Sequence, residues 1–224
     1  MIDDDKRLAA EAAVAEIEPG MVVGLGTGST TAHAIAAIGA KVAAGLRIDA
    51  VATSRASERL AAQYGIPLLD FEDVAAIDLA IDGADEIDPV LRAIKGAGGA
   101  MLREKIVATA AHRMIAIADG SKRVARLGAA RVPVEVLPFA RSFAAAALAE
   151  LGAVPELRMA GPDPYLTDQD NIVLDCAVAA LDAPEALAAA LAAIPGVMGH
   201  GLFVTEIDAA YIAADGRVER LART

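Results

Sequence analysis

Apolar residues in the first half of the chain fall into short runs separated by longer amphipathic stretches. Short apolar runs bounded by turn residues are typical of buried strands, and these runs occupy positions 21–25, 48–53, 66–69, 79–81 and 114–118. The stretches between them space their apolar residues along one helix face, at 3–17, 32–44, 55–64 and 99–111. This alternation predicts an α/β fold, in which a Rossmann-like open, mostly parallel sheet carries helices on both faces.

The rhythm changes after position 131. The pattern predicts strands at 132–137, 157–159, 172–177 and 201–204, with helices at 140–151 and 183–194. This β-α-β-β-α-β order is typical of a ferredoxin-like α+β domain. We therefore expect an inserted domain at 132–204 and a catalytic domain formed by 1–131 and 205–224. A hairpin turning at Asp215-Gly216 should return the chain to the first sheet.

Polar clusters follow three of the predicted strands. Thr27 to Thr30 come after the first strand, Asp82 to Asp85 after the fourth, and Asp119 to Lys122 after the fifth. In an open parallel sheet, ligands bind in the crevice outside the carboxyl ends of the strands. We therefore expect these clusters to converge on one site.

A glycine-rich loop that begins at Lys95 leads into the helix carrying Glu104. Backbone N–H groups at a glycine-rich helix start bind anions, and the helix dipole adds to this attraction. A carboxylate beside an anion site costs electrostatic energy, so Glu104 is a candidate for moving a proton. An ordinary ion pair with Arg103 or a later cation would explain Glu104 equally well. Lys6 and Lys41 are interpreted as surface positions on their helices.

The segment from Gly24 to Thr30 invites two interpretations. A dinucleotide fingerprint would require glycine or alanine at position 29, where Ser29 stands, although Arg55 could suit an NADP phosphate. The alternative uses the hydroxyls of Thr27, Ser29 and Thr30, with backbone N–H groups, to bind a phosphate monoester. An ordinary capped turn would also account for these residues.

Composition narrows the possible partners. The net charge of −11 opposes binding to nucleic acids and anionic membranes, and an aromatic content of 3% without tryptophan argues against base stacking. The single Cys176 excludes an internal disulfide, and the scattered histidines indicate no metal site. The acidic N-terminal residues lack the apolar segment of a signal peptide, so we expect a cytoplasmic protein.

Several motifs together resemble one family, type A ribose-5-phosphate isomerase. They are GLGTGST at 24–30, TSRASE at 53–58, DGADEID at 82–88, KGAGGAMLREKIVA at 95–108, ADGSK at 118–122, PVEVLPFAR at 133–141, IPGVMGHGLF at 194–203 and YIAADGRVERL at 211–221. The resemblance implies an aldose–ketose isomerase that interconverts D-ribose 5-phosphate and D-ribulose 5-phosphate, in the non-oxidative pentose phosphate pathway. It implies no metal and no cofactor, a sugar phosphate as the small-molecule partner, and a homodimer or homotetramer. We expect the inserted domain to lie at the oligomer interface.

The resemblance also implies the site residues. Glu104 matches the catalytic base, which would transfer a proton between C2 and C1 through an enediolate, and Asp82, Asp85 and Lys95 match further catalytic groups. The matched substrate-binding positions are Thr27, Gly28, Ser29, Thr30, Asp82, Gly83, Ala84, Asp85, Lys95, Gly96, Ala97, Gly98 and Lys122.

Two residues depart from the family pattern. Ala97 stands where glycine is frequent in the loop, and Asp170 replaces a glycine in a turn of the inserted domain. A rival interpretation is a non-catalytic sugar-phosphate sensor, which would need the anion pocket but not Glu104. Such sensors often carry a DNA-binding module, and the sequence shows no basic helix-turn-helix.

Overall fold

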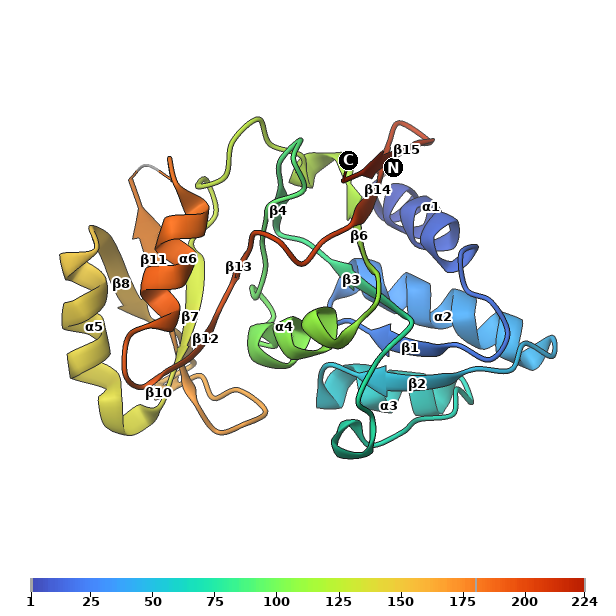
Figure 1. The fold of residues 1–224 in the computed structure, drawn as a ribbon, viewed down its shortest axis with the longest axis horizontal. Helices are drawn as coiled ribbons and strands as arrows, with labels where there is room; N and C mark the ends of the chain where they lie inside the picture. The colour runs from blue at the N-terminus through green and yellow to red at the C-terminus, as the bar shows by residue number, and fades with distance from the viewer. Residues whose placement is uncertain (1, 180, 224) are drawn as a thin grey trace.

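The computed structural model describes residues 2–179 and 181–223. Residues 1 and 224, the outer ends of the predicted catalytic domain, and residue 180 of the predicted inserted domain lie outside this description. The molecule is elongated, with a large helix-covered sheet at one end and a smaller sheet with two helices at the other (Figure 1). Within the described residues, no helix is both long and apolar enough to cross a membrane.

The large sheet has six strands in the order β15-β14-β6-β3-β1-β2, and only β15 runs antiparallel to its neighbour. The strands are β1 (Val22–Leu25), β2 (Asp49–Ala52), β3 (Leu79–Gly83), β6 (Met114–Asp119), β14 (Ala209–Ala214) and β15 (Arg217–Ala222). The helices are α1 (Ile2–Val14), α2 (Ser29–Ala43), α3 (Arg55–Gln63) and α4 (Met101–Ala110). The prediction of a Rossmann-like, mostly parallel sheet is confirmed.

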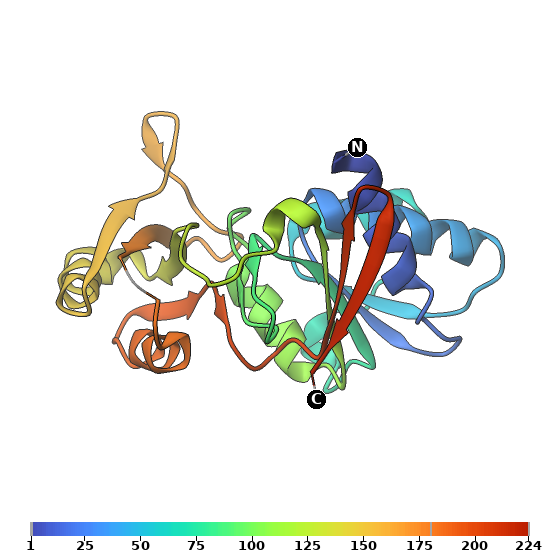
Figure 2. The same ribbon diagram turned by 90° about the horizontal axis from the view of Figure 1, so that it is seen from above.

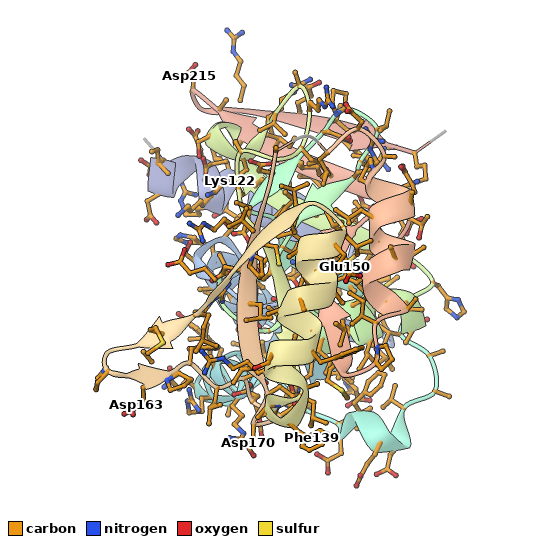
Figure 3. The ribbon with its side chains drawn as sticks, turned by 90° about the vertical axis from the view of Figure 1, so that its left-hand side faces the viewer. Lys122, Phe139, Glu150, Asp163, Asp170 and Asp215 are labelled. Atoms are coloured by element: carbon orange, nitrogen blue, oxygen red, sulfur yellow. The ribbon has the colours of Figure 1, made fainter. Side chains whose placement is uncertain are left out.

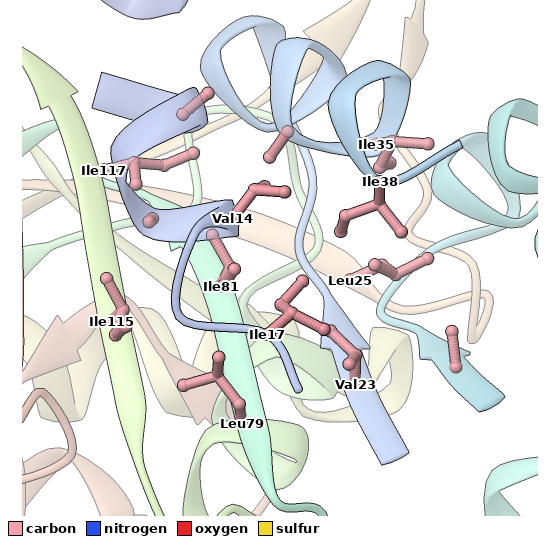
Figure 4. Close-up of a cluster of buried hydrophobic side chains, with 14 of the residues drawn as sticks. Val14, Ile17, Val23, Leu25, Ile35, Ile38, Leu79, Ile81, Ile115 and Ile117 are labelled. Carbon is pink, nitrogen blue, oxygen red and sulfur yellow. The ribbon is translucent and has the colours of Figure 1, made fainter. Parts of the chain in front are cut away.

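Alternating strand residues divide the core between the two faces of this sheet. Leu79 and Ile81 of β3 pack with residues of α1 and α2 on one face (Figure 4). Ala80 points to the other face, where Val107 of α4 packs. A Cβ on Gly24 would lie 2.6 Å from Val107 Cγ1. The glycine in β1 therefore lets α4 approach the sheet closely enough to bring its first turn to the strand ends.

The second sheet is antiparallel, in the order β12-β7-β11-β8. Its elements are β7 (Val132–Val136), α5 (Arg141–Glu150), β8 (Ala153–Leu157), β11 (Ile172–Val178), α6 (Pro184–Ala192) and β12 (Val197–His200). This is the predicted ferredoxin-like arrangement, and it has a hydrophobic core of its own. A short hairpin of β9 (Met159–Ala160) and β10 (Asp163–Pro164) projects from it (Figure 2).

A small three-stranded sheet, which the sequence did not predict, joins the two regions. It contains β4 (Glu86–Ile87), β5 (Ala93–Ile94) and β13 (Leu202–Phe203), in the order β13-β5-β4. The strand predicted at 201–204 was therefore assigned to the wrong sheet, since β13 pairs with β5. The fourth ferredoxin-like strand is β12, whose Gly199 weakens the strand signal in the sequence.

Two further strand predictions were wrong. Residues 66–69 form no strand of their own, although Ala50 donates a hydrogen bond to Pro67 O and accepts one from Leu69. Pro67 has no N–H group with which to extend the pairing. The strand predicted at 157–159 lies earlier, as β8, which accommodates Pro155 because it is an edge strand. The C-terminal hairpin is confirmed, with left-handed φ angles of 51° at Asp215 and 74° at Gly216.

Three short 3₁₀ helices complete the described elements. They are η1 (Phe71–Asp73), η2 (Gly120–Lys122) and η3 (Pro138–Ala140). The second of these follows β6 directly, so it holds Lys122 at the same edge of the large sheet as the ends of β1 and β3.

Candidate active site

A cavity of about 260 Å³ opens at the carboxyl ends of β1 and β3. The chain leaves β1 toward β2 on one side and leaves β3 toward β6 on the other, so the cavity lies where the strand order reverses. Its lining comprises Lys6, Thr27, Gly28, Ser29, Thr30, Gly83, Ala84, Asp85, Lys95, Gly96, Ala97, Gly98, Glu104 and Lys122. The structure thus gathers every predicted site residue at the cavity wall except Asp82.

Asp82 lies behind the wall and ties the ends of β1 and β3 together. Its Oδ1 accepts hydrogen bonds from Thr27 N (3.0 Å), Gly83 N (2.7 Å) and the Thr31 hydroxyl (3.3 Å). A Cβ at Gly26 would lie 2.0 Å from that same oxygen. Only glycine at position 26 therefore allows the first loop, residues 26–28 between β1 and α2, to close over the carboxylate.

The first loop presents the start of α2 to the cavity. Gly28 precedes the helix with φ of 116°, and no side chain caps the first turn of α2. The Thr27 hydroxyl, a predicted phosphate contact, donates to Ser54 Oγ at 2.8 Å in this structure, and the residue lines the cavity. The donors at this end of the cavity are therefore the helix N–H groups and the hydroxyls of Ser29 and Thr30.

Lys6 adds a cation to this end of the cavity. Its Nζ donates to Ser29 Oγ at 3.0 Å, and the residue is part of the cavity wall. Lys6 is a partly exposed helix position, as predicted, but its place in the cavity wall was not predicted from the helical pattern. That pattern does not reveal that α1 packs across α2, which brings Lys6 to the first turn of α2.

Three buried charged residues meet beside the cavity, with Lys95 and Glu104 in its wall and Asp82 behind it. Lys95, Asp82 and Glu104 are 3%, 3% and 5% exposed. Lys95 Nζ lies 2.9 Å from Asp82 Oδ2 and 3.3 Å from Glu104 Oε2, and it donates a hydrogen bond to Gly83 O. Among the described residues, neither of these two carboxylate oxygens receives a hydrogen bond. One ammonium thus faces two carboxylates that retain free acceptor capacity.

This charge imbalance favours an extra proton on Glu104. Burial raises the pKa of Glu104 to about 8, the negative charge of Asp82 adds to the rise, and Lys95 opposes it. Burial alone would lower the pKa of Lys95, but its attraction to Asp82 and Glu104 outweighs that effect and raises it. Asp82, with three donors on Oδ1, is the better-stabilised anion. The site therefore combines a fixed cation with a carboxyl group that can exchange a proton near neutral pH.

The glycine-rich loop and η2 supply the remaining wall. Asp85 Oδ2 accepts a hydrogen bond from Ala97 N at 2.9 Å. The positive φ angles of the loop fall on Gly96 (99°) and Gly99 (79°) and not on Ala97, so alanine is compatible with this loop geometry. Within residues 2–179 and 181–223, no group of three or more histidine, cysteine, aspartate or glutamate side chains is placed to bind a metal.

Comparisons with known proteins agree on one family. The model of ribose 5-phosphate isomerase A (phosphoriboisomerase A) matches residues 49–217. Ribose-5-phosphate isomerase A from Sphingopyxis alaskensis is 53% identical over 215 residues, which cover 96% of this chain and 94% of that protein. The corresponding protein from Parvibaculum lavamentivorans is 46% identical over 220 residues, covering 95% of each.

Solved structures give the same result. Ribose 5-phosphate isomerase A from Neisseria gonorrhoeae superposes with a TM-score of 0.94 at 37% identity, covering 100% of this chain and 98% of that one. A D-ribose-5-phosphate isomerase in complex with phospho-erythronic acid superposes with a TM-score of 0.96 at 38% identity, covering 100% of both chains.

The raised pKa of Glu104 predicts a pH-dependent stability difference. Between its ordinary value of 4.5 and about 8, the unfolded chain ionises this group while the folded protein keeps the proton, so stability falls as the pH rises. Glu104→Gln cannot ionise. In urea unfolding, the free energy of unfolding of the variant should therefore rise relative to that of wild type by roughly 4 kcal/mol between about pH 5 and about pH 9.

The control for this measurement is Glu150→Gln, an exposed position on α5 (Figure 3). The difference in unfolding free energy between Glu150→Gln and wild type should not change with pH. If the difference between Glu104→Gln and wild type is likewise the same at both pH values, the pKa of Glu104 is not raised.

Proposed function

Because the chain belongs to the ribose 5-phosphate isomerase A family, we propose that Glu104 is the base that isomerises ribose 5-phosphate to ribulose 5-phosphate. The observation that carries this proposal is the buried Glu104, which lies 3.3 Å from the Lys95 ammonium in the wall of an anion-binding cavity. The rival sugar-phosphate sensor gains no support, because such a sensor has no use for a buried carboxyl group with a raised pKa.

The first step is removal of the C2 proton from the open-chain aldose. Ionised Glu104 takes that proton, the C–H electron pair forms the C1–C2 double bond, and the carbonyl π electrons move onto O1. The Lys95 ammonium stabilises the negative charge that develops on this oxygen. Because its pKa is raised, Lys95 remains a cation throughout and acts through its charge.

The second step returns the proton to C1. The double-bond electrons form the new C1–H bond, and O2 becomes the ketone oxygen once its hydroxyl proton has moved to O1. Asp85 is our candidate for this shuttle, since its carboxylate lines the cavity and is oriented by the Ala97 N–H. A protonated Glu104 is the product of the first step, so the raised pKa narrows the energy gap between reactant and intermediate.

The phosphate should bind at the start of α2. The uncapped helix start, the hydroxyls of Ser29 and Thr30, and the cation Lys6 together suit a dianion, and Lys122 adds a further cation to the same cavity. A similar structure is described as a complex with phospho-erythronic acid, a sugar-acid phosphate, which supports the proposal that this cavity takes a sugar phosphate. Phosphate binding would fix the reacting carbons beside Glu104 and so lower the barrier.

For Asp82 we propose a role different from the one that the resemblance implies. It does not line the cavity, and its Oδ1 is occupied by the loop donors. We propose that Asp82 holds the Lys95 ammonium in place and helps keep the proton on Glu104 through its negative charge. Direct contact with substrate hydroxyls is left to Asp85.

We also propose that residues 132–204 form an inserted domain and that it lies at the interface of a homodimer or homotetramer. Phe139, just before α5, is 96% exposed (Figure 3). Phe143, in the first turn of α5, is 58% exposed, and Leu137 before the helix is 42% exposed. Exposed apolar side chains that gather in this way are typical of protein interfaces. We place the protein in the cytoplasm, where the buried, unpaired Cys176 would stay reduced.

The role of Glu104 as the base is tested by measuring turnover. Purified protein treated with EDTA and given ribose 5-phosphate without nucleotide should form ribulose 5-phosphate. Glu104→Gln should lower kcat by roughly 10²- to 10⁴-fold with little change in substrate affinity, because it removes only the proton acceptor. A variant with near-normal kcat would remove Glu104 from this role.

Lys6→Ala should raise KM for ribose 5-phosphate by roughly 5- to 30-fold and change kcat much less, because one charge-assisted phosphate contact is lost. The matched control is Arg7→Ala on the same helix, whose side chain pairs with Glu11 at the surface. Equal KM values for the two variants in steady-state assays would show that Lys6 does not contact the phosphate.

Light scattering should give the wild-type protein the mass of a dimer or tetramer, and Phe139→Glu should lower that mass. Val90→Glu, at an exposed apolar position between β4 and β5, is the control and should leave the mass unchanged. A monomeric wild type, or a Phe139→Glu variant with the wild-type mass, would contradict the interface proposal.

A further inference from the structure

We propose that Arg158 and Tyr165, on the ferredoxin-like side of the molecule, are positioning residues for the active site. They hold the substrate loop, defined here as Lys95 to Gly99, in its binding conformation. The proposal rests on the isomerase function proposed above. It gives the second sheet a part in the reaction that is separate from any part in oligomer assembly.

Three successive carbonyl groups of the substrate loop are bound from outside the large sheet. Arg158 Nη1 donates to Gly96 O and to Ala97 O, each at 3.0 Å. The Tyr165 hydroxyl donates to Gly98 O at 3.1 Å. A Cβ at Gly99 would lie 2.3 Å from the Tyr165 hydroxyl oxygen, which shows how closely this side chain lies over the loop.

Holding these carbonyl groups fixes where the N–H groups of the loop point. In a planar trans peptide the N–H lies opposite the C=O of the preceding residue. With Gly96 O turned toward Arg158, the Ala97 N–H points the other way, and it donates to Asp85 Oδ2 at 2.9 Å. By the same geometry, the hydrogen bond from Arg158 to Ala97 O turns the N–H of Gly98, a cavity-lining residue, away from Arg158. The hydrogen bonds from Arg158 and Tyr165, called the clamp below, therefore orient two N–H groups of the loop. One is that of Ala97, which holds the Asp85 carboxylate, and the other is that of Gly98.

Arg158 can act as a fixed point because its own side chain is held. Its Nε donates to Asp175 Oδ2 at 2.8 Å, and its Nη2 pairs with the other oxygen of the same carboxylate. Asp175 lies in β11, at the centre of the second sheet. Both partners are mostly buried, at 15% and 21% exposed. A forked guanidinium–carboxylate pair of this kind fixes orientation as well as charge.

Tyr165 belongs to the same unit. Its backbone N–H donates to Arg158 O at 2.9 Å, and its ring centre lies 5.7 Å from the guanidinium carbon. Three residues further along, Asp168 Oδ2 accepts the Arg55 N–H at 2.7 Å, at the start of α3. The segment from Arg158 to Asp168 thus contacts the large-sheet region at two places, the substrate loop and the start of α3.

The substrate loop needs such support because its own sequence does not fix it. Gly96 and Gly99 have positive φ angles, and glycine is the residue with the most backbone freedom to lose. Lys95 is held separately, by Gly201 O at 2.8 Å from its N–H and by the buried carboxylates. Loss of the clamp should therefore loosen residues 96–99 while leaving the charge cluster in place.

The test compares Arg158→Ala, Arg158→Lys and Tyr165→Phe with the control Arg131→Ala. Arg131 makes an exposed ion pair with Glu156 of β8 and does not touch the loop. Arg158→Ala should lower kcat/KM for ribose 5-phosphate by roughly 10- to 100-fold, and Tyr165→Phe by roughly 2- to 5-fold. Arg158→Lys should not restore activity, because one ammonium cannot hold Asp175 and two carbonyl groups with the same fork. Arg131→Ala should retain wild-type kcat/KM.

Hydrogen–deuterium exchange separates positioning from a merely structural effect. In Arg158→Ala, amides 96–99 should exchange faster, while those of β7 and β11 keep their wild-type protection. Wild-type exchange in the loop, restoration by Arg158→Lys, or loss of protection throughout the second sheet would each overturn the proposal. A wild-type protein that does not isomerise ribose 5-phosphate would instead defeat the proposed function, and the exchange measurement would still decide whether the clamp exists.

Discussion

The structure depends on burying one ammonium group with two carboxylates at the ends of the central strands. Lys95, Asp82 and Glu104 come from different elements, and each is at most 5% exposed. Buried charges are tolerable only when paired, so β3, the substrate loop and α4 must meet at this point. Gly24 and Gly26 permit that meeting, because a side chain at either position would collide with α4 or with Asp82. Because one ammonium faces two carboxylates, the pKa of Glu104 is raised and this group can hold a proton. The buried charges that fix the packing at this point are therefore also able to exchange a proton.

Most of the fold and nearly all of the cavity wall could be predicted from the sequence, because the signals were local. Apolar runs marked β1, β3 and β6, and the clusters after them met as expected at the strand ends. Lys6 was missed because its position depends on how α1 crosses α2, which a helical pattern does not encode. The strands β4, β5 and β13 are two residues long, too short for any periodicity to reveal. The hydrogen bond from the Thr27 hydroxyl to Ser54 was not predicted either, because the two residues are distant in sequence.

Three sheets contribute to the cavity. The large sheet supplies the strand ends and the start of α2, whereas the small three-stranded sheet brings Lys95 against Gly201 on the return from β12. Phe203 of β13, fully buried, places its ring 5.3 Å from the Lys95 ammonium. The ferredoxin-like region then holds the carbonyl side of the substrate loop through Arg158. Substitutions far from the reacting carbons can therefore alter the reaction by moving this loop.

The central claim is that a proton passes through Glu104 between two adjacent carbons. The most direct measurement is the deuterium content at C1 of ribulose 5-phosphate formed in D₂O at early conversion, read by proton NMR. The account predicts deuterium at C1, with partial transfer of the original hydrogen because Glu104 is buried and exchanges slowly with solvent. Complete retention of the C2 hydrogen, together with loss of activity on chelation and its recovery with a divalent metal, would contradict the account and indicate a hydride shift.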